Sequence, residues 1–432
     1  MGWGVGYVRM NPDVVIAALT VGAVTYFGSD AHDTTAASTA WQPRVCWLRT
    51  DGADSVFLVA YEVQTASPTV WAFRLATVAA DATVTYGSRT TIAASGGVAG
   101  PSLTRLSETE VWFAYEPSPA TADTMKGRII TVTGSSISVG SANTSTNVWR
   151  FLSSANPARI HSGGRLAYVY TFETYLNIYW RLRSAADGYT ADVDWWNVHE
   201  VSGPAKLHYD PQIIPLGDNG GGEDSLITWV GYGSDDVLEF GACGVRLYPG
   251  NTQWRGSAST LDLTGYAGNY SKKFWSARTG DQQVTLFVAQ FSPGDTYQLM
   301  QYVTATLDPD TMGITWGTIT TVLTPDGWAD LPRAVTRSDN YWGALAKTVS
   351  IHSDTYGHDQ LDLQLLTPGD PPGLSFPGSG PTGFPVFDKL FDADIAFDAA
   401  TGLGLLVCNE EDNFPETGDY SWYTFGVPFK VA

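Results

Sequence analysis

Basic residues are scarce in this sequence. Its 24 Lys and Arg stand against 44 Asp and Glu, which gives a formal net charge of −20 at pH 7. The basic residues are scattered singly, apart from the adjacent pair Lys272 and Lys273. Binding to a phosphate backbone requires Lys and Arg that displace counterions. The charge therefore argues against nucleic acid as a partner and against contact with anionic membrane surfaces.

Cysteine and histidine are also rare. The three cysteines, Cys46, Cys243 and Cys408, are too far apart for a Cys-x-x-Cys metal site, and an odd number gives no disulfide framework. We predict that they are small buried side chains. With six His in the whole chain, a transition-metal site is not expected.

Export signals and long apolar segments are missing as well. Residues 1–10 lack the basic start and the apolar stretch of a signal peptide. Residues 14–24 are apolar but too short to span a bilayer. We expect no membrane insertion, and synthesis in the cytoplasm without export by the general route. No long stretch has the period of an amphipathic helix.

The residues that are abundant favour strands. Aromatic residues make up 13% of the chain, whereas charged residues make up 16%, below the usual share of a soluble protein. Aromatic residues and Thr suit pleated, half-buried strands, and the 45 Gly suit tight turns between them. The composition therefore predicts an all-β fold.

A unit of four strands repeats along the chain. It opens with an apolar run, often after proline, and continues with an alternating run such as 57–62, a third strand such as 70–75 and a short strand ending in Gly, such as 84–87. We attribute that Gly to a turn that needs positive φ. The repeat predicts a seven-bladed β-propeller of four-stranded blades. The units start near residues 43, 101, 157, 211, 273, 332 and 388, with gaps of 58, 56, 54, 62, 59 and 56 residues.

The last unit stops after three strands. The missing strand is predicted near the N-terminus, where Val24-Thr25-Tyr26-Phe27-Gly28 matches Val84-Thr85-Tyr86-Gly87. A three-plus-one closure follows, in which residues 23–27 complete the seventh blade. We thus divide the chain into residues 1–20, an N-terminal extension and candidate anchor, and residues 21–432, a single seven-bladed β-propeller.

One face of the ring is a candidate ligand site. In four-stranded blades, the loops from the second to the third strand and the connections between blades open on the same face. Here they carry aromatic and acidic residues, which suit a neutral or cationic ligand such as a sugar, whose C–H faces stack on Trp and Tyr. The alternative is that the aromatic residues wedge neighbouring blades together. The candidate ligand-binding residues are Trp41, Glu62, Glu116, Trp149, Tyr270, Trp328, Asp354, Tyr356, His358, Glu411 and Asp412.

No motif identifies a catalytic residue. Glycosidases need paired carboxylates, but acids are so plentiful here that a pair means little. Arg44 and Arg333 stand at matching places in two units and with Arg159 suggest an arginine cluster, which the repeat explains equally well. The acidic segments 218–224 and 410–419 suit Ca²⁺ through their oxygens but match no full loop pattern, so neither a metal nor a cofactor is assigned.

The blade texture resembles a known class of protein. The Pro-opened first strand, the V-A-Y-E run at 59–62 and the V-T-Y-G-S run at 84–88, in a Thr/Ser-rich, Lys-poor chain, resemble propeller domains of phage virion proteins such as tail or head fibres and receptor-binding proteins. The resemblance implies a virion-associated structural or adhesion protein whose partners are host-surface carbohydrate or other virion proteins. It favours binding over catalysis.

A weaker similarity points to an enzyme. Sialidases and other propeller glycosidases carry Ser-x-Asp-x-Gly-x-Thr-Trp turns, and residues 184–190 (S-A-A-D-G-Y-T) resemble one with the wrong spacing and without the Trp. This similarity implies hydrolysis of a surface polysaccharide, which stands as the alternative function.

Overall fold

A computed structural model of the chain shows strands as the regular elements of its described part, within which no helix has the length and apolar character needed to cross a membrane. The structure describes residues 19–26, 40–63, 70–93, 99–116, 124–146, 149–155, 165–172, 177–184, 192–200, 208–219, 221–232, 238–248, 253–263, 273–291, 298–322, 327–336, 341–351, 358–369, 373–375, 386–387, 389–414 and 419–431.

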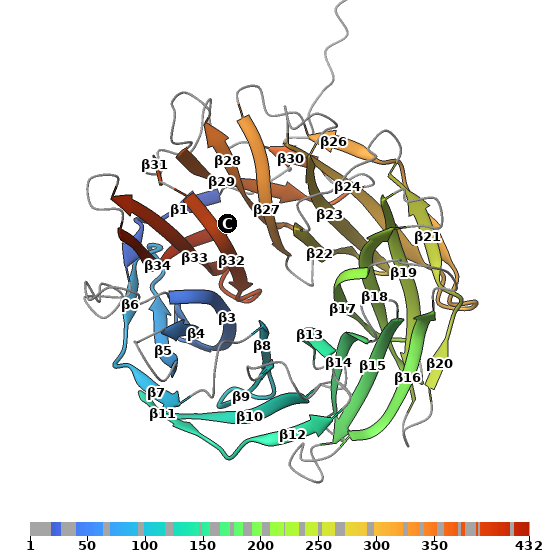
Figure 1. Ribbon diagram of the computed structural model, residues 1–432, viewed down its shortest axis with the longest axis horizontal. Coiled ribbons are helices and arrows are strands. Elements are labelled where there is room, and N and C mark those ends of the chain that lie inside the picture. The colour runs from blue at the N-terminus through green and yellow to red at the C-terminus, as the bar shows by residue number, and fades with distance from the viewer. Residues whose placement is uncertain are drawn as a thin grey trace, which may run out of the picture.

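The described strands form seven antiparallel sheets (Figure 1). The first three along the chain are β3 (Ala40–Asp51), β4 (Asp54–Val63), β5 (Val70–Val78), β6 (Val84–Tyr86) and β7 (Thr90–Ala93); β8 (Ala99–Arg105), β9 (Glu110–Glu116), β10 (Thr124–Thr133), β11 (Ser136–Val139) and β12 (Asn143–Thr146); and β13 (Trp149–Ala155), β14 (Arg165–Phe172), β15 (Asn177–Ser184) and β16 (Asp192–Glu200).

Three further sheets and a closing sheet complete the set. The three are β17 (His208–Asp218), β18 (Glu223–Tyr232), β19 (Leu238–Leu247), β20 (Gln253–Arg255) and β21 (Ser259–Asp262); β22 (Lys273–Gly280), β23 (Gln283–Phe291), β24 (Gln298–Leu307), β25 (Ile314–Trp316) and β26 (Thr320–Val322); and β27 (Gly327–Thr336), β28 (Gly343–Ile351), β29 (His358–Thr367), β30 (Gly373–Ser375) and β31 (Val386–Phe387). The closing sheet combines β32 (Lys389–Phe397), β33 (Leu403–Phe414) and β34 (Asp419–Val431) with β1 (Leu19–Val21) and β2 (Thr25–Tyr26).

The sheets follow one another around a ring. Their first strands contact in order, β3 with β8, β8 with β13, β13 with β17, β17 with β22, β22 with β27 and β27 with β32, and β32 contacts β3 again. These strands lie toward the middle of Figure 1, with the last strands of the sheets at the rim. The prediction of an all-β propeller is confirmed. Predicted unit starts 43, 101, 211, 273 and 332 lie in first strands, while 157 and 388 fall outside the described residues.

The hydrophobic core lies between the sheets rather than within one layer. Trp71 on β5 and Phe113 on β9 meet edge-on, with ring centroids 4.9 Å apart, in a cluster that joins the first two sheets. A second cluster joins Val59 on β4 to Leu405 on β33 across the next interface. Because both faces of β4 meet a neighbouring sheet, the strand is buried from Ser55 to Val63. This two-sided burial explains the nearly continuous apolar character of the second strands.

The N-terminal strands complete the last sheet, as predicted. β1 pairs with the end of β34, with Leu19 opposite Val431, and β2 pairs further back, with Tyr26 opposite Phe425. Leu19 and Thr20 thus belong to the closing sheet, which begins before the boundary predicted at residue 21.

The predicted register of this closure is wrong. In the first sheet the N–H of Gly87 donates to the carbonyl of Leu75 over 2.8 Å, and in the closing sheet the N–H of Gly22 donates to the carbonyl of Pro428 over the same distance. The counterpart of Gly87 is therefore Gly22, not Gly28, and β2 is the counterpart of β7. The L-T-V-G run at 19–22 carried the correct signal, because its Gly directly follows the short strand.

The outer strand, predicted as one short strand ending in Gly, is followed in most sheets by a second short strand. β6 and β7 pair with opposite ends of β5, and an equivalent pair of short strands stands in the other five-stranded sheets. The positive-φ explanation for the intervening Gly is also wrong, since Gly87, Gly140 and Gly256 are not among the residues with positive φ. Their N–H groups instead return to the third strand.

Two of these glycines are needed because another backbone comes close. A Cβ at Gly22 would lie 2.0 Å from the carbonyl oxygen of Ala82, and a Cβ at Gly256 would lie 2.0 Å from that of Met312. Ala82 and Met312 occupy matching turns of the following sheet, and both have positive φ, 61° and 58°. The close approach therefore recurs at two interfaces between sheets.

We predict that Gly22→Ala lowers the free energy of unfolding by about 1–3 kcal/mol, because the backbone of the neighbouring turn must move to admit the methyl group. Gly87→Ala is the matched control, since its Cβ would meet the carbonyl oxygen of Leu75 at an ordinary 3.6 Å. Urea unfolding of both variants gives the comparison. Equal effects at the two positions would show that the contact with Ala82 does not constrain residue 22.

Candidate functional site

Three predicted tryptophans occupy corresponding places in their sheets. Trp41 stands opposite Glu62, Trp149 opposite Thr171, and Trp328 opposite Ser350, in each case where the first strand begins and the second ends. The first strands line the middle of the ring (Figure 1). The register places these three residues at the same end of their sheets, where the first strand begins. We call this end the strand-start face.

The predicted acids and histidine reach the same end, but as strand residues rather than loop residues. Glu116 ends β9 opposite Ala99, and His358 begins β29 opposite Ile351. Glu411 lies opposite Lys389, and Asp412 follows it on β33. The prediction that these groups sit in second-to-third loops is therefore wrong, because the second strands end later than their apolar stretch suggested and the third strand β29 already begins at His358.

Glu62 is the predicted site residue whose side chain the structure describes. It is 1% exposed and stands in the ladder between Trp41 on β3 and Trp71 on β5. Its carboxylate is thus part of the buried sheet and not of an open loop. Tyr270, Asp354 and Tyr356 lie outside the described residues.

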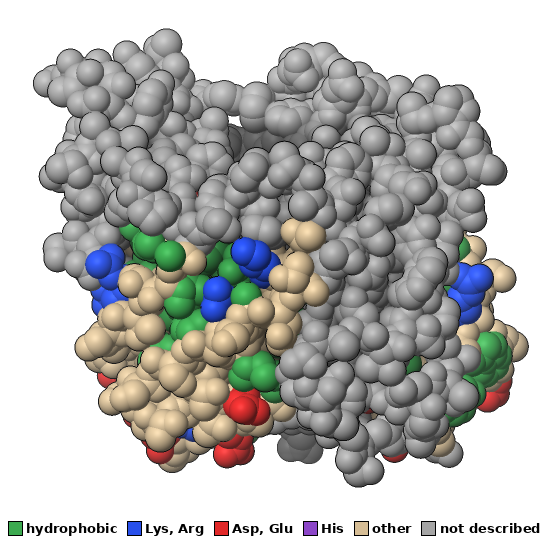
Figure 2. Space-filling model, turned by 60° about the horizontal axis from the view of Figure 1, so that its bottom comes forward, with side chains coloured by type: hydrophobic (Ala, Val, Ile, Leu, Met, Phe, Trp, Pro, Cys, Tyr) green, Lys and Arg blue, Asp and Glu red, His purple; other side chains and the backbone are tan. Residues whose placement is uncertain are grey.

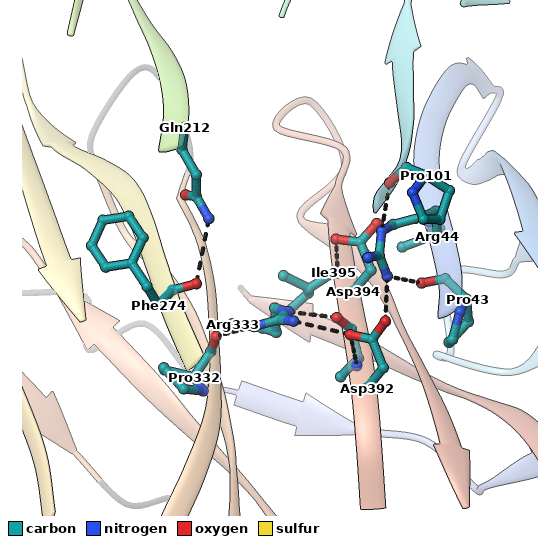
Figure 3. Close-up of polar contacts among 12 residues, drawn as sticks. Pro43, Arg44, Pro101, Gln212, Phe274, Pro332, Arg333, Asp392, Asp394 and Ile395 are labelled. Atoms are coloured by element: carbon teal, nitrogen blue, oxygen red, sulfur yellow. Dashed lines mark hydrogen bonds and ion pairs between the residues drawn. The ribbon is translucent and has the colours of Figure 1, made fainter. Parts of the chain in front are cut away.

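A second polar cluster lies near the axis, where first strands meet. Figure 3 shows Arg44 and Arg333 reaching Asp392 from opposite sides. Arg44 Nη1 lies 2.8 Å from Asp392 Oδ2, and Arg333 Nη2 lies 3.1 Å from Asp392 Oδ1. Asp392 is 19% exposed and Arg44 20%, so the pair still touches solvent. We call Arg44, Arg333, Asp392 and Asp394 the axial cluster.

The two arginines also bind neighbouring backbones. Arg44 Nε donates to the carbonyl of Pro101 on β8 over 2.9 Å, and Arg333 Nε donates to the carbonyl of Ala393 on β32. Each guanidinium additionally contacts the carbonyl of the proline before it, Pro43 or Pro332. Both side chains therefore link the first strand of their own sheet to that of the next.

Asp394 makes a link of the same kind without an arginine. Its Oδ2 accepts a hydrogen bond from the N–H of Val45 on β3 over 2.9 Å, and its Oδ1 accepts one from the N–H of Ile395 over 3.0 Å. Gln212 on β17 does the same with neutral groups, accepting from the N–H of Ser276 over 2.8 Å and donating to the carbonyl of Phe274 over 3.4 Å.

The two aspartates of the axial cluster have opposite pKa shifts. Burial favours the neutral form of Asp392, but the charges of Arg44 and Arg333 outweigh it and hold its pKa below the ordinary value. Burial raises the pKa of Asp394 to about 6, although the same two charges and its N–H donors oppose the rise. One carboxyl is therefore ionised over a pH range in which the other still carries its proton.

Half of this cluster can be read from the sequence. The repeat places Arg44 and Arg333 at matching positions, but it does not single out Asp392, which pairs with both, or Asp394 and Gln212, which bind the backbone of the next sheet. The available signal was the residue after the opening proline, which is Arg44, Gln212 or Arg333 and reaches the next sheet in each case. Arg159 lies outside the described residues.

Acidic side chains also mark the opposite end of the sheets, along the lower edge of Figure 2. There Asp81 and Asp308 accept hydrogen bonds from the hydroxyls of Thr83 and Thr311 over 2.7 Å, and these bonds lower both pKa values. Their carboxylates shape turns. Asp224, within one segment considered for Ca²⁺, is instead the partner of Arg246 over 2.5 Å. The described residues contain no cluster of three metal-capable side chains.

Neither a protein-family model nor a curated protein matches the sequence. Among solved structures, the chain is similar to a protein of unknown function from Dyadobacter fermentans, with 10% identity, a TM-score of 0.46, and coverage of 96% of this chain and 100% of that one. It is also similar to an α-L-arabinofuranosidase of Fusarium graminearum, with 10% identity, a TM-score of 0.42 and coverage of 76% and 92%. An α-L-arabinanase of Penicillium chrysogenum follows with 11% identity, a TM-score of 0.38 and the same coverage.

At such low identities and TM-scores, these likenesses carry no argument about the function of this chain. The evidence for the propeller fold is the pairing of this chain's own strands. The resemblance to phage virion proteins is not tested by the comparisons, and it stays a prediction.

We predict that Asp392→Asn lowers the free energy of unfolding at pH 7 by about 2–3 kcal/mol, because two guanidinium groups then face a neutral amide. The exposed turn variant Asp81→Asn is the control and should stay within about 0.5 kcal/mol of the parent. Both are measured by urea unfolding. A loss no larger than that of the control would mean that the arginines need no charged partner.

Proposed function

We propose that the protein binds carbohydrate on the strand-start face. The observation that carries this proposal is the equivalent placement of Trp41, Trp149 and Trp328 in three first-strand ladders. Aromatic rings stack on the C–H faces of sugars, and several of them around one axis allow contact with more than one sugar unit. Acids at the same end, including Glu116 and Glu411, supply acceptors for hydroxyl groups.

The charges favour a neutral or cationic glycan. The chain carries a formal net charge of −20, which repels acidic polymers. The two axial arginines already donate to Asp392, so they do not form an unoccupied site for a ligand carboxylate. A sialidase-like arginine site is therefore a poor match to this geometry.

A second candidate function is hydrolysis of a glycosidic bond. One observation favours it: Asp392 and Asp394 are two residues apart on β32, and their pKa values are displaced in opposite directions. An acid and a base of this chemistry need one protonated and one ionised carboxyl group.

Binding is tested with Trp41→Ala, Trp328→Ala and the double variant on a glycan array, followed by titration with the best ligand. We expect each single change to weaken binding about tenfold, since stacking contributes on the order of 1–1.5 kcal/mol. Trp254→Ala is the control, because Trp254 lies on the rim strand β20 and is 36% exposed. Full affinity in the double variant would reject the proposal, and a lower melting temperature with unchanged affinity would favour a wedge role.

Hydrolysis is tested by sugar release from a panel of polysaccharides that includes arabinan. If Asp394 is the acid, activity should fall as pH rises through about 6, the pKa to which burial raises it, because the proton is lost there. Asp394→Asn should abolish release, whereas Asp81→Asn should not. If Asp394→Asn releases sugar as fast as the parent protein, Asp392 and Asp394 are not the catalytic carboxyl groups.

A further inference from the structure

The joint between the last and the first sheet differs from the other described joints in its chemistry. Asp394 Oδ2 on β32 accepts from the N–H of Val45 on β3, so a carboxyl group holds the backbone where β32 meets β3. At the joint between β17 and β22, the corresponding contact to the N–H of Ser276 comes from the neutral amide of Gln212. One joint therefore has a titratable group where the other has none.

The two guanidinium groups near Asp394, those of Arg44 and Arg333, are paired with Asp392. Both guanidinium groups of the axial cluster donate to oxygens of Asp392, whereas the hydrogen bonds given to Asp394 come from backbone N–H groups. The charges that act on Asp394 are those of Arg44 on β3 and Arg333 on β27, and Asp392 stands two residues before it on β32. On β33, the titratable residue Cys408 stands opposite the neighbouring Ala393. On β29, which also contacts β32, Asp362 is paired with Lys347.

We propose that Asp394 is a proton-operated clasp of the ring, which holds β3 against β32 more firmly when its carboxyl is protonated than when it is ionised. Asp394 is 8% exposed, so a charge on it is buried, and it stands two residues from a second carboxylate, Asp392, that takes the arginine contacts. Protonation removes that charge while both oxygens remain able to accept from Val45 and Ile395.

The direction of the pH dependence follows from linkage. Asp394 titrates near pH 3.8 without the fold, and burial raises its pKa to about 6 within it. Between these values the folded state holds a proton that the unfolded state has lost, so stability falls as the pH rises through this window. A shift of about two pKa units corresponds to about a 100-fold fall in the folding equilibrium constant. Asp392 acts in the opposite sense, because its contribution is present above its ordinary pKa and is lost below its lowered one.

The clasp is tested by hydrogen exchange of the whole protein, read by mass spectrometry on peptides that contain Val45 or Ser276. After correction for the intrinsic pH dependence of exchange, we expect protection at Val45 to fall by up to about 100-fold between pH 4 and pH 7. Protection at Ser276, held by Gln212, should stay constant over the same range.

Two reciprocal variants complete the test. Asp394→Asn should remove the pH response at Val45, and Gln212→Glu should introduce one at Ser276. An equal pH response at both joints of the parent protein would overturn the proposal without any variant. A response at Val45 that persists in Asp394→Asn would overturn it as well.

Discussion

The inner edge of the first strand in each sheet is the main structural constraint on this ring, because no further strand pairs with it. Such an edge leaves N–H and C=O groups without ladder partners at the place where the sheets converge. Side chains from the neighbouring sheet supply partners at several joints. Arg44 reaches Pro101, Gln212 reaches Phe274 and Ser276, and Arg333 reaches Ala393. The axis is thus held by side-chain to backbone bonds that repeat from joint to joint.

Away from the axis, the same sheets are held by two other kinds of contact. Apolar clusters fill the space between them, as with Trp71 and Phe113. Nearer the rim, backbone meets backbone where Gly22 lies against Ala82, and Arg246 donates to the carbonyl of Pro309 in the next sheet over 2.8 Å. Neighbouring sheets are thus joined by polar bonds near the axis, apolar packing in the middle and close backbone contact nearer the rim.

The sequence predicts the repeat well because the repeat is a pattern of burial. Second strands such as β4 are covered on both faces, so their apolar runs stand out whatever their neighbours are. The position of the closing strand was harder to predict, since L-T-V-G at 19–22 and V-T-Y-F-G at 24–28 both fit a short strand before Gly. The choice depends on which backbone hydrogen bond the Gly makes, and that bond joins residues about 400 apart in the chain (Gly22 and Pro428).

The candidate site, too, could be predicted from the sequence only in part. The places of Trp41, Trp149 and Trp328 at one end of their sheets follow from the repeat, because equivalent positions in a propeller are equivalent in space. The pairing of Arg44 and Arg333 with Asp392 does not follow from it. The contact joins residues of three different sheets, on β3, β27 and β32. Pairing between unlike members of a repeat leaves no periodic trace in the sequence.

The divided outer strands affect how copies of the molecule meet one another. β6 and β7 offer three and four residues in a row, and the strands at the edges of most other sheets are similarly short. Runs of this length are poor templates for strand addition between molecules. Within the described residues, β16 departs from the pattern with nine unbroken residues, Asp192–Glu200. Among the described rim strands, β16 therefore offers the longest edge for pairing with a strand of another molecule.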